Sequence, residues 1–218
     1  NRTPRHRIDD LRLGTAYPKG AIESALQTKN LKPQHLLNEG ELTQTVARLL
    51  AEGSIVGWFQ DRMEFGPRAL GARSILASPR PAAMRERVND VKLREQFRPF
   101  AGSILQERVH EYFRVPEPNH ASPFMTFCFP VRPEKQGELA AIVHADGTCR
   151  VQTVSPEQGR YYRLIKAFAD LTGTPCLLNT SFNLKGEPIV ESPEQAIEDF
   201  LKTTMDALAI GDFLLAKR

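Results

Sequence analysis

The sequence contains few of the residues that build metal sites and disulfide frameworks. It has three cysteines, none in a CxxC pair, and its five histidines form neither an HxxxH nor an HxH pair. We therefore expect no metal site built from this chain alone. An odd number of cysteines without a framework predicts reduced, buried thiols, and on this basis we expect a cytoplasmic protein.

Long apolar runs are also missing. Apolar runs such as Ala207–Ile210 and Phe213–Ala216 have the length of a strand, so we expect no membrane-spanning segment. Residues 1–7 lack the apolar stretch of a secretory signal. Hydrophobic residues make up 41% of the chain and charged residues 25%, which is ordinary for a globular protein and predicts a substantial core.

Positive charge is concentrated in one segment. Residues 62–98 contain 9 Lys or Arg against 4 Asp or Glu, whereas the rest of the chain contains 20 against 22. At the start of this segment, Arg68 and Arg73 stand in a glycine-containing stretch that lets backbone and side chains approach a ligand closely. Guanidinium groups bind phosphate oxygens through paired hydrogen bonds. The segment therefore predicts a partner that carries phosphate.

Three more cations follow, Lys92, Arg94 and Arg98, which are separated by even numbers of residues, two and then four. In an extended segment this spacing would place them on one side. The alternative is an ordinary solvated basic face. Apolar neighbours favour partly buried cations that need an anionic partner, and these neighbours are Phe65, Leu70, Phe97, Pro99 and Phe100. A P-loop is not expected, because Ala72-Arg73-Ser74 stands where that motif needs Lys followed by Ser or Thr.

The order of the predicted elements favours an α/β domain. Periodicity and helix-start signals predict helices from Glu41, from Pro81, near residues 109–113, over 157–172 and from Pro193. Strands are predicted over residues 54–59, 73–77, 101–105, 124–131, 175–178, 208–210 and 213–216, and Asp146-Gly147 predicts a hairpin between 139–144 and 149–154. Interleaved helices and strands with a hairpin predict one domain with a mixed sheet, over residues 41–218. Residues 1–40 are expected to form a linker or strap with a short helix near 22–26.

A second polar group follows the strand predicted at 175–178. Asn179, Ser181 and Asn183 are expected on a loop over residues 179–188, where their amide and hydroxyl groups can bind phosphate, ribose or a planar amide. A polar turn bonded to itself is an equally good interpretation. Arg150, expected in mid-strand, is either an anion ligand or a plain surface arginine. Ser181 is not expected to be a nucleophile, because no GxSxG motif or nearby histidine accompanies it.

Four stretches of the chain, in this order, resemble the C-terminal part of the NodU/CmcH family of O-carbamoyltransferases. They are FGPRALGARSIL (65–76), NDVK to RPF (89–100), HADGTCRVQT (144–153) and LNTSFN to GEPI (178–189), and the resemblance extends over residues 11–218. It implies a YrdC-like fold, which is a twisted open α/β sheet. It also implies the formation of carbamoyl-adenylate from carbamoyl phosphate and ATP with Mg²⁺.

The resemblance also implies the site residues. It places Arg68, Lys92 and Arg98 in catalysis, and it adds ligands for carbamoyl phosphate and ATP, namely Arg73, Arg94, Arg150, Asn179, Ser181 and Asn183. In the family, the carbamoyl group then passes to a hydroxyl of a natural product or sugar in a larger N-terminal domain, where His and Asp bind a metal. This chain has no counterpart of that domain, so we expect it as a partner in cis or in trans, linked through residues 1–40.

Two other functions are compatible with the residues. A basic groove on such a fold suits RNA, but the sequence contains no aromatic stacking platform or extended basic stripe, so nucleic acid is not the expected partner. The other alternative is a non-catalytic half that only supports a partner domain, and it predicts no nucleotide binding.

Overall fold

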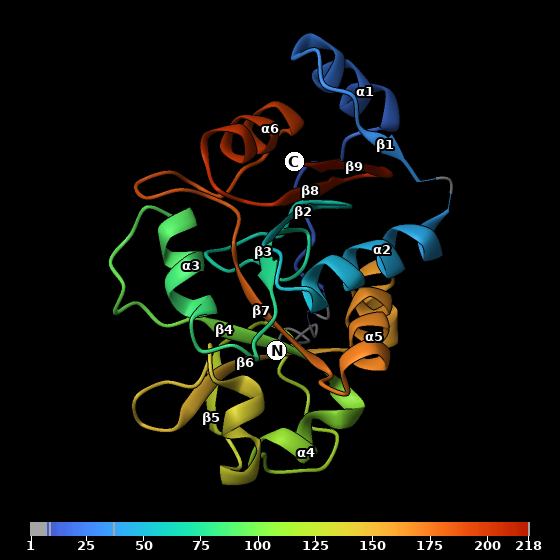
Figure 1. Cartoon of the computed structure of the whole chain (residues 1–218). Coiled ribbons are helices and arrows are strands. Elements are labelled where there is room, and N and C mark those ends of the chain that lie inside the picture. The colour runs from blue at the N-terminus through green and yellow to red at the C-terminus, as the bar shows by residue number, and fades with distance from the viewer. Residues whose placement is uncertain (1–7, 9, 37, 218) are drawn as a thin grey trace, which may run out of the picture.

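The computed structural model describes residues 8, 10–36 and 38–217, which form one open sheet flanked by helices (Figure 1). Its strands are β1 (Gln34–His35), β2 (Val56–Phe59), β3 (Arg73–Ala77), β4 (Ala101–Leu105), β5 (Phe127–Pro130), β6 (Thr148–Val154), β7 (Cys176–Ser181), β8 (Ala207–Ile210) and β9 (Phe213–Ala216). Their order across the sheet is β1-β9-β8-β2-β3-β7-β4-β6-β5. The pairs β2–β8 and β4–β6 are parallel, and the other neighbouring pairs are antiparallel. The predicted mixed sheet in one α/β domain is therefore confirmed.

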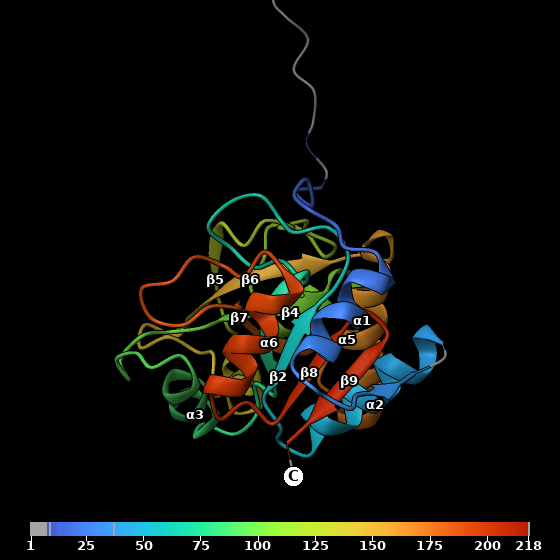
Figure 2. The same ribbon diagram turned by 90° about the horizontal axis from the view of Figure 1, so that it is seen from above.

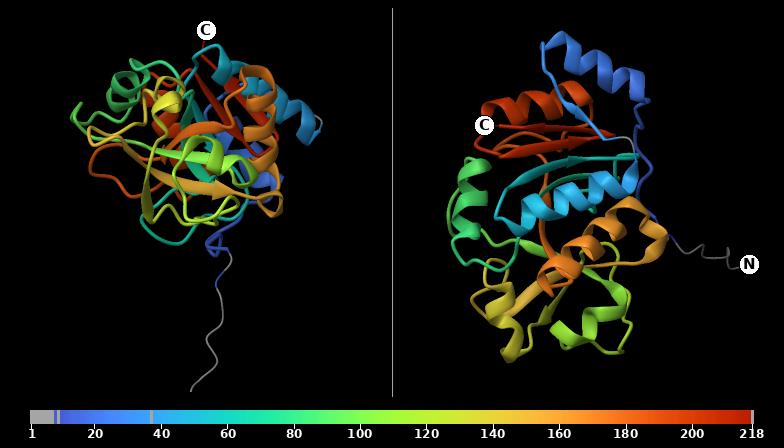
Figure 3. Two further views of the ribbon diagram at one scale, coloured as in Figure 1. Left: turned by 90° about the horizontal axis from the view of Figure 1, so that it is seen from below. Right: turned by 45° about the vertical axis from the view of Figure 1, so that its right-hand side comes forward.

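Helices cover both faces of this sheet (Figure 3). The helices α2 (Glu39–Ala51) and α5 (Arg160–Thr172) pack side by side on one face, and α1 (Lys19–Thr28), α3 (Met84–Val91) and α6 (Pro193–Lys202) lie on the other. Strand alternation divides the core in the same way. Ile75 and Ala77 of β3 join the core with α3 and α6, whereas Leu76 joins the core with α2 and α5. The short helix α4 (Val109–Tyr112) lies beyond β4 along the chain.

The helix ends follow the signals in the sequence. Ser192 caps α6 by accepting a hydrogen bond from the Gln195 N–H, and the Gln195 side chain returns one, which confirms the predicted capping box. The helix α5 ends at Gly173, whose φ of 79° is left-handed. It begins three residues later than predicted, because a 3₁₀ turn (Pro156–Gln158) and Gly159, with a φ of 60°, precede it. Likewise α3 starts at Met84 rather than at Pro81.

The predicted hairpin between residues 139–144 and 149–154 is wrong. Residues 139–144 contain no strand; they end a 3₁₀ helix (Pro133–Leu139) and continue as a turn in which Leu139, Ala141 and Ile142 are buried. Both edges of β6 are already occupied, by β4 on one side and β5 on the other, so no hairpin partner fits there. Asp146 instead accepts hydrogen bonds from the N–H and hydroxyl of Thr148.

Part of the segment expected as a linker belongs to the folded unit. Ile22, Ala25 and Leu26 of α1 are buried, and α1 lies beside α6 (Figure 2). The strand β1 pairs with β9 at one edge of the sheet. The helix expected near residues 22–26 is thus present and longer, while residues 1–7 and 9 lie outside the described part of the chain. The link from residues 1–40 to a further domain stays a prediction. Among the described helices, none combines the length and apolarity needed to cross a bilayer.

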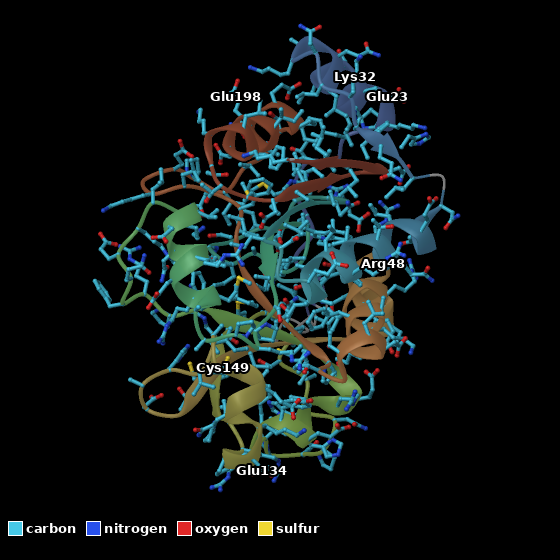
Figure 4. All side chains as sticks on the ribbon, viewed as in Figure 1. Glu23, Lys32, Arg48, Glu134, Cys149 and Glu198 are labelled. Carbon is cyan, nitrogen blue, oxygen red and sulfur yellow. The ribbon has the colours of Figure 1, made fainter. Side chains whose placement is uncertain are left out.

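The three thiols are free. Cys149 in β6 and Cys176 in β7 are buried in the sheet as predicted, and Cys149 is labelled in Figure 4. Burial raises the pKa of Cys149 to about 12 and that of Cys176 well above its usual value, so both are inert thiols. Cys128 in β5 is exposed, which corrects the prediction for this residue.

Residues 60–72 join β2 to β3 and are called the arginine-glycine loop. The Glu64 carboxylate lies inside it and accepts hydrogen bonds from the backbone N–H groups of Leu70, Ala72 and Arg73, at 2.5, 3.0 and 3.3 Å. Only 1% of Glu64 is exposed to solvent. One carboxylate therefore fixes the path of the second half of the loop.

A strap, residues 11–15, lies across the first half of this loop. The Gly14 N–H donates to the Met63 carbonyl, the Met63 N–H to the Thr15 carbonyl, and the Phe65 N–H to the Leu11 carbonyl. These bonds hold the strap and the loop as a short pair of adjacent backbones.

Alanine substitutions at Gly71 and Gly66 would show how tightly the arginine-glycine loop is packed. Both have positive φ, 102° and 121°, so alanine strains the backbone at either position. At Gly71 a Cβ atom would also lie 2.2 Å from the Tyr161 ring, whereas at Gly66 no described atom lies within 4 Å of it. We expect Gly71→Ala to lower the free energy of unfolding by at least about 2 kcal/mol more than Gly66→Ala in urea denaturation. Equal losses in the two variants would contradict this packing.

Candidate functional site

A hollow of about 90 Å³ lies at the edge of the sheet where β4 and β6 begin and β7 ends. It gathers three arginines from distant parts of the chain: Arg68 from the arginine-glycine loop, Arg94 from the turn after α3, and Arg150 from β6. The rest of its wall consists of Pro67, Ala69, Pro99, Phe100, Ala101, Met125, Asn179, Thr180 and Ser181. Three cations thus share a hollow whose wall, among the described residues, contains no carboxylate.

Arg94 and Arg150 of the hollow are partly buried, Arg68 is exposed, and neighbouring arginines repel one another. Burial and then the nearby charge of Arg98 lower the pKa of Arg94 to about 10. Burial and then the charge of Arg68 lower the pKa of Arg150. Within the described structure, Arg94 Nη2 and Arg150 Nε are buried and donate no hydrogen bond. An anion in the hollow would satisfy these donors and relieve the repulsion.

Other contacts hold Arg94 and its neighbours in place. Arg94 Nε donates to Asn89 Oδ1 at 2.7 Å, and its guanidinium carbon lies 4.5 Å from the centre of the Phe100 ring. The carbonyl of Phe100 lies 3.0 Å from His144 Nε2. The turn that carries Arg94 is therefore tied to the start of β4.

Lys92 supports the hollow from behind and does not line it. It ends α3, is 3% exposed, and its ammonium donates to the carbonyls of Ser181 and Asn183 at 2.5 and 2.9 Å and to Asn183 Oδ1 at 2.9 Å. Burial, and then the charge of Arg94, lower the pKa of Lys92 to about 7. Ser181 Oγ donates to the same Asn183 oxygen at 2.6 Å. Lys92 thus fastens the end of β7 to the end of α3.

The strand β7 is longer than predicted and carries Asn179, Thr180 and Ser181, which were expected on a loop. The extension is paired on both sides, because Asn179 lies opposite Ala101 of β4, and Ser181 lies opposite Ser74 of β3. A rigid strand, rather than a polar turn, therefore presents these groups at the hollow.

Four predicted site residues do not line the hollow: Lys92 and Asn183, which bond to each other as described above, and Arg73 and Arg98. Arg73 is 0% exposed, its guanidinium donates to the carbonyls of Gln60 and Thr15 at 2.7 and 3.2 Å, and it stacks 3.6 Å from the Phe59 ring centre. Burial lowers the pKa of Arg73 to about 10. Arg98 is exposed and pairs with Glu95 at 3.0 Å. The structure does not bring either guanidinium to the hollow.

The predicted extended arrangement of residues 92–98 is wrong. Lys92 ends a helix, and Leu93 has a φ of 53°, so the segment is a turn in which spacing does not define a side. Phe65 and Phe97 are 72% and 82% exposed, so they do not provide the expected apolar surroundings. Phe100, also expected, is buried against the Arg94 guanidinium, and the packing of separate strands and loops completes the burial of the cations.

Three functional residues were not singled out from the sequence. Thr180 and Met125 line the hollow, and Glu64 shapes the arginine-glycine loop. An acidic residue within a strongly cationic segment was the available signal for Glu64. Met125 has a φ of 55° in a proline-rich turn, and no local pattern predicts where that turn lies.

A larger cavity, of about 1110 Å³, lies beside this region of the chain. Phe124 and Thr126 line it, and Met125 between them lines the hollow. Its other walls combine apolar and polar side chains, among them Asn119, Ser122, Pro156, Glu157 and Tyr162. Throughout the described residues, no group of three or more His, Cys, Asp or Glu is placed to hold a metal ion.

Lys92 provides a test of the burial described above. Its folded pKa of about 7 is below the ordinary 10.5, so between these values the unfolded chain keeps a proton that the folded state releases. Wild-type stability should therefore rise with pH relative to Lys92→Met, by up to about 1.4 kcal/mol per pH unit. Urea denaturation at about pH 7, 8 and 9 measures the difference. The control is Lys166→Met at an exposed position. The difference in unfolding free energy between wild type and this variant should stay the same from pH 7 to 9. If the difference for Lys92→Met is equally constant, the burial effect is refuted.

Comparisons with known proteins identify the family. The family model described as carbamoyltransferase C-terminus matches residues 47–217. The chain is 49% identical over 180 residues to Nodulation protein NolNO of Sinorhizobium fredii, covering 82% of this chain and 26% of that protein. It is 46% identical over 220 residues to Nodulation protein NolO of Bradyrhizobium diazoefficiens, covering 99% of this chain and 40% of that protein. The chain thus spans less than half the length of these relatives.

Solved structures show the same fold. A phosphate- and nucleotide-bound full-length HypF aligns with a TM-score of 0.56 and 22% identity, over 81% of this chain and 26% of that one. P. abyssi Sua5 complexed with L-threonine aligns with a TM-score of 0.60 and 17% identity, over 80% of this chain and 47% of that one. These similarities confirm the YrdC-like fold. With the match over residues 47–217, they lead to one conclusion: the chain belongs to the carbamoyltransferase C-terminus family.

Proposed function

We propose that this chain forms carbamoyl-adenylate from carbamoyl phosphate and ATP, and that a domain outside the chain passes the carbamoyl group to a hydroxyl acceptor. The convergence of Arg68, Arg94 and Arg150 on one hollow, with unpartnered donors on two of them among the described residues, supports this most directly. The family supports carbamoyl transfer as the overall reaction. The similar HypF structure contains phosphate and nucleotide.

The reaction proceeds in two balanced steps. Carbamoyl phosphate reacts with water and releases inorganic phosphate, which leaves carbamate. A carbamate oxygen then forms a bond to the α-phosphorus of ATP, and the bond to the leaving pyrophosphate breaks. Negative charge builds up on the phosphoryl oxygens in the second step, and Arg68, Arg94 and Arg150 are placed to stabilise it. Carbamate is already a nucleophile, so this step needs no general base.

The two cavities suit different parts of the substrates. A hollow of about 90 Å³ fits a phosphate group with its carbamoyl substituent, and the second cavity, of about 1110 Å³, has room for a nucleoside. Phe124 and Pro156 of the larger cavity offer apolar surface for a base, and Asn119 and Ser122 offer hydrogen bonds.

The described residues supply no carboxylate set that fits Mg²⁺ at the hollow. Magnesium commonly binds through substrate phosphates and water, so we expect it to arrive with ATP. Bound with ATP, the ion would neutralise part of the phosphate charge, while the chain itself contributes arginines, hydrogen-bonding groups of β7 and exclusion of water. The metal-binding transfer domain expected from the resemblance lies outside this chain, as does the selection of the acceptor.

Arg68→Ala tests this assignment. Removing one converging guanidinium should lower the rate of carbamoyl-adenylate formation by about 10²- to 10³-fold, because developing charge loses a preorganised partner. The protein is incubated with ATP, Mg²⁺ and carbamoyl phosphate, and mass spectrometry follows carbamoyl-AMP, AMP and pyrophosphate. Arg150→Ala should have an effect of the same size.

Arg80→Ala is the matched control, because it removes the same charge from the same cationic segment at an exposed position beyond the opposite end of β3. It should keep the wild-type rate. Full activity of Arg68→Ala would overturn the site assignment. Wild-type protein that binds no nucleotide in calorimetry would favour a supporting, non-catalytic half, and steeply salt-dependent RNA binding would favour the nucleic-acid alternative.

A further inference from the structure

Asn179 carries a buried hydrogen-bond acceptor that the protein leaves unused. The residue is 1% exposed and lines the hollow. Its side-chain Nδ2 donates to the Ala69 carbonyl at 3.1 Å, to Ser103 Oγ at 2.9 Å and to Gln152 Oε1 at 3.2 Å. Its Oδ1 accepts no hydrogen bond from any described residue. Buried polar groups are rarely left in this state, so the oxygen calls for a donor from outside the chain.

The orientation of this amide is fixed by its neighbours. Gln152 Nε2 donates to the Leu70 carbonyl at 2.9 Å, which turns Gln152 Oε1 toward Ser103 and Asn179. A carbonyl and an amide oxygen only accept hydrogen bonds, so Asn179 must present Nδ2, not Oδ1, to Ala69 and Gln152. The Ala69 and Leu70 carbonyls of the arginine-glycine loop thus fix the orientation of the Asn179 and Gln152 side-chain amides.

The same contacts turn Oδ1 away from the interior of β4 and β6. Ser103 and Gln152 lie two residues deeper in their strands than Ala101 and Arg150, which line the hollow. Because the nitrogen and oxygen of an amide diverge, Nδ2 faces the deeper pair and Oδ1 is turned away from it. The hollow therefore combines unpartnered donors, on Arg94 and Arg150, with one unpartnered acceptor, counting the described residues.

We propose that Asn179 Oδ1 accepts a hydrogen bond from the NH₂ group of carbamoyl phosphate and so selects a carbamoyl over an acetyl group. The complement of the hollow is a ligand with anionic oxygens beside an N–H donor, and carbamoyl phosphate has this combination. Acetyl phosphate has the same charge and nearly the same shape, but it places a methyl group at the acceptor. A buried acceptor left facing a methyl group disfavours binding. This role rests on the proposed function, since it names the feature of the substrate that this site recognises.

Ser103 acts as a positioning residue for Asn179. Its hydroxyl donates to Gln152 Oε1 at 2.7 Å and accepts from Asn179 Nδ2, so it closes a buried triangle of side chains on β4, β6 and β7. Removing this hydroxyl leaves Asn179 in place with a weaker restraint on its amide. Its loss should reduce selectivity without removing it.

The test compares carbamoyl phosphate with acetyl phosphate in calorimetric titrations of the whole chain, at low temperature because carbamoyl phosphate decomposes in water. Wild-type protein should bind carbamoyl phosphate at least about 10-fold more tightly. Asn179→Ala should weaken carbamoyl phosphate binding by about 10- to 100-fold and change acetyl phosphate binding by less than about 3-fold. Acetyl phosphate thus serves as the internal control for fold and anion binding.

Ser103→Ala tests the same inference if Asn179→Ala does not fold. It should reduce the preference for carbamoyl phosphate over acetyl phosphate by about 3-fold. The inference is overturned if wild-type protein binds both acyl phosphates equally, or if the folded variants keep the wild-type preference. In those outcomes ATP-dependent release of pyrophosphate by wild-type protein still supports the proposed function. Wild-type protein that binds neither acyl phosphate overturns the proposed function and this inference together.

Discussion

The hydrogen bonds of the Glu64 carboxylate hold the rest of the site together. Three backbone N–H groups of the arginine-glycine loop converge on one of its oxygens, which keeps the loop closed over α5 at Gly71. The closed loop places Arg68 at the hollow and turns its Ala69 and Leu70 carbonyls toward the amides below. The position of a cation and the orientation of an acceptor thus follow from the same bonds.

The site is built at a cost in folding stability. Like charges close together, partly buried charged groups and unpartnered polar atoms all oppose folding, and the structure collects them at one end of β4, β6 and β7. An anionic ligand removes these unfavourable terms when it binds. The repulsion in the site lowers the folding stability, and well-packed regions such as the α2–α5 pair compensate for it. Relief of this repulsion contributes to the free energy of ligand binding.

Local patterns predicted much of the fold. The bounds of β3, β4 and β9 and the capping box of α6 agree with the sequence, because each depends on neighbouring residues. The hairpin failed because pairing of β6 is decided by strands far away in the chain. In the site, too, local motifs predicted some features and tertiary packing decided the others. Motifs pointed to Arg68, Arg94, Arg150, Asn179 and Ser181, which the hollow gathers. The burial of Arg73 among backbone carbonyls depends on tertiary packing that no motif encodes.

The strap over residues 11–15 has a thermodynamic consequence. Its backbone is bonded to Met63 and Phe65, three to five residues before Arg68, so a force on the chain ahead of Leu11 reaches the loop through these bonds. If a displacement of the strap shifts Arg68, it changes the affinity of the hollow for its ligand, and an occupied hollow then stabilises the strap by the same free energy. In that case ligand occupancy of the hollow and the conformation of the strap are thermodynamically linked.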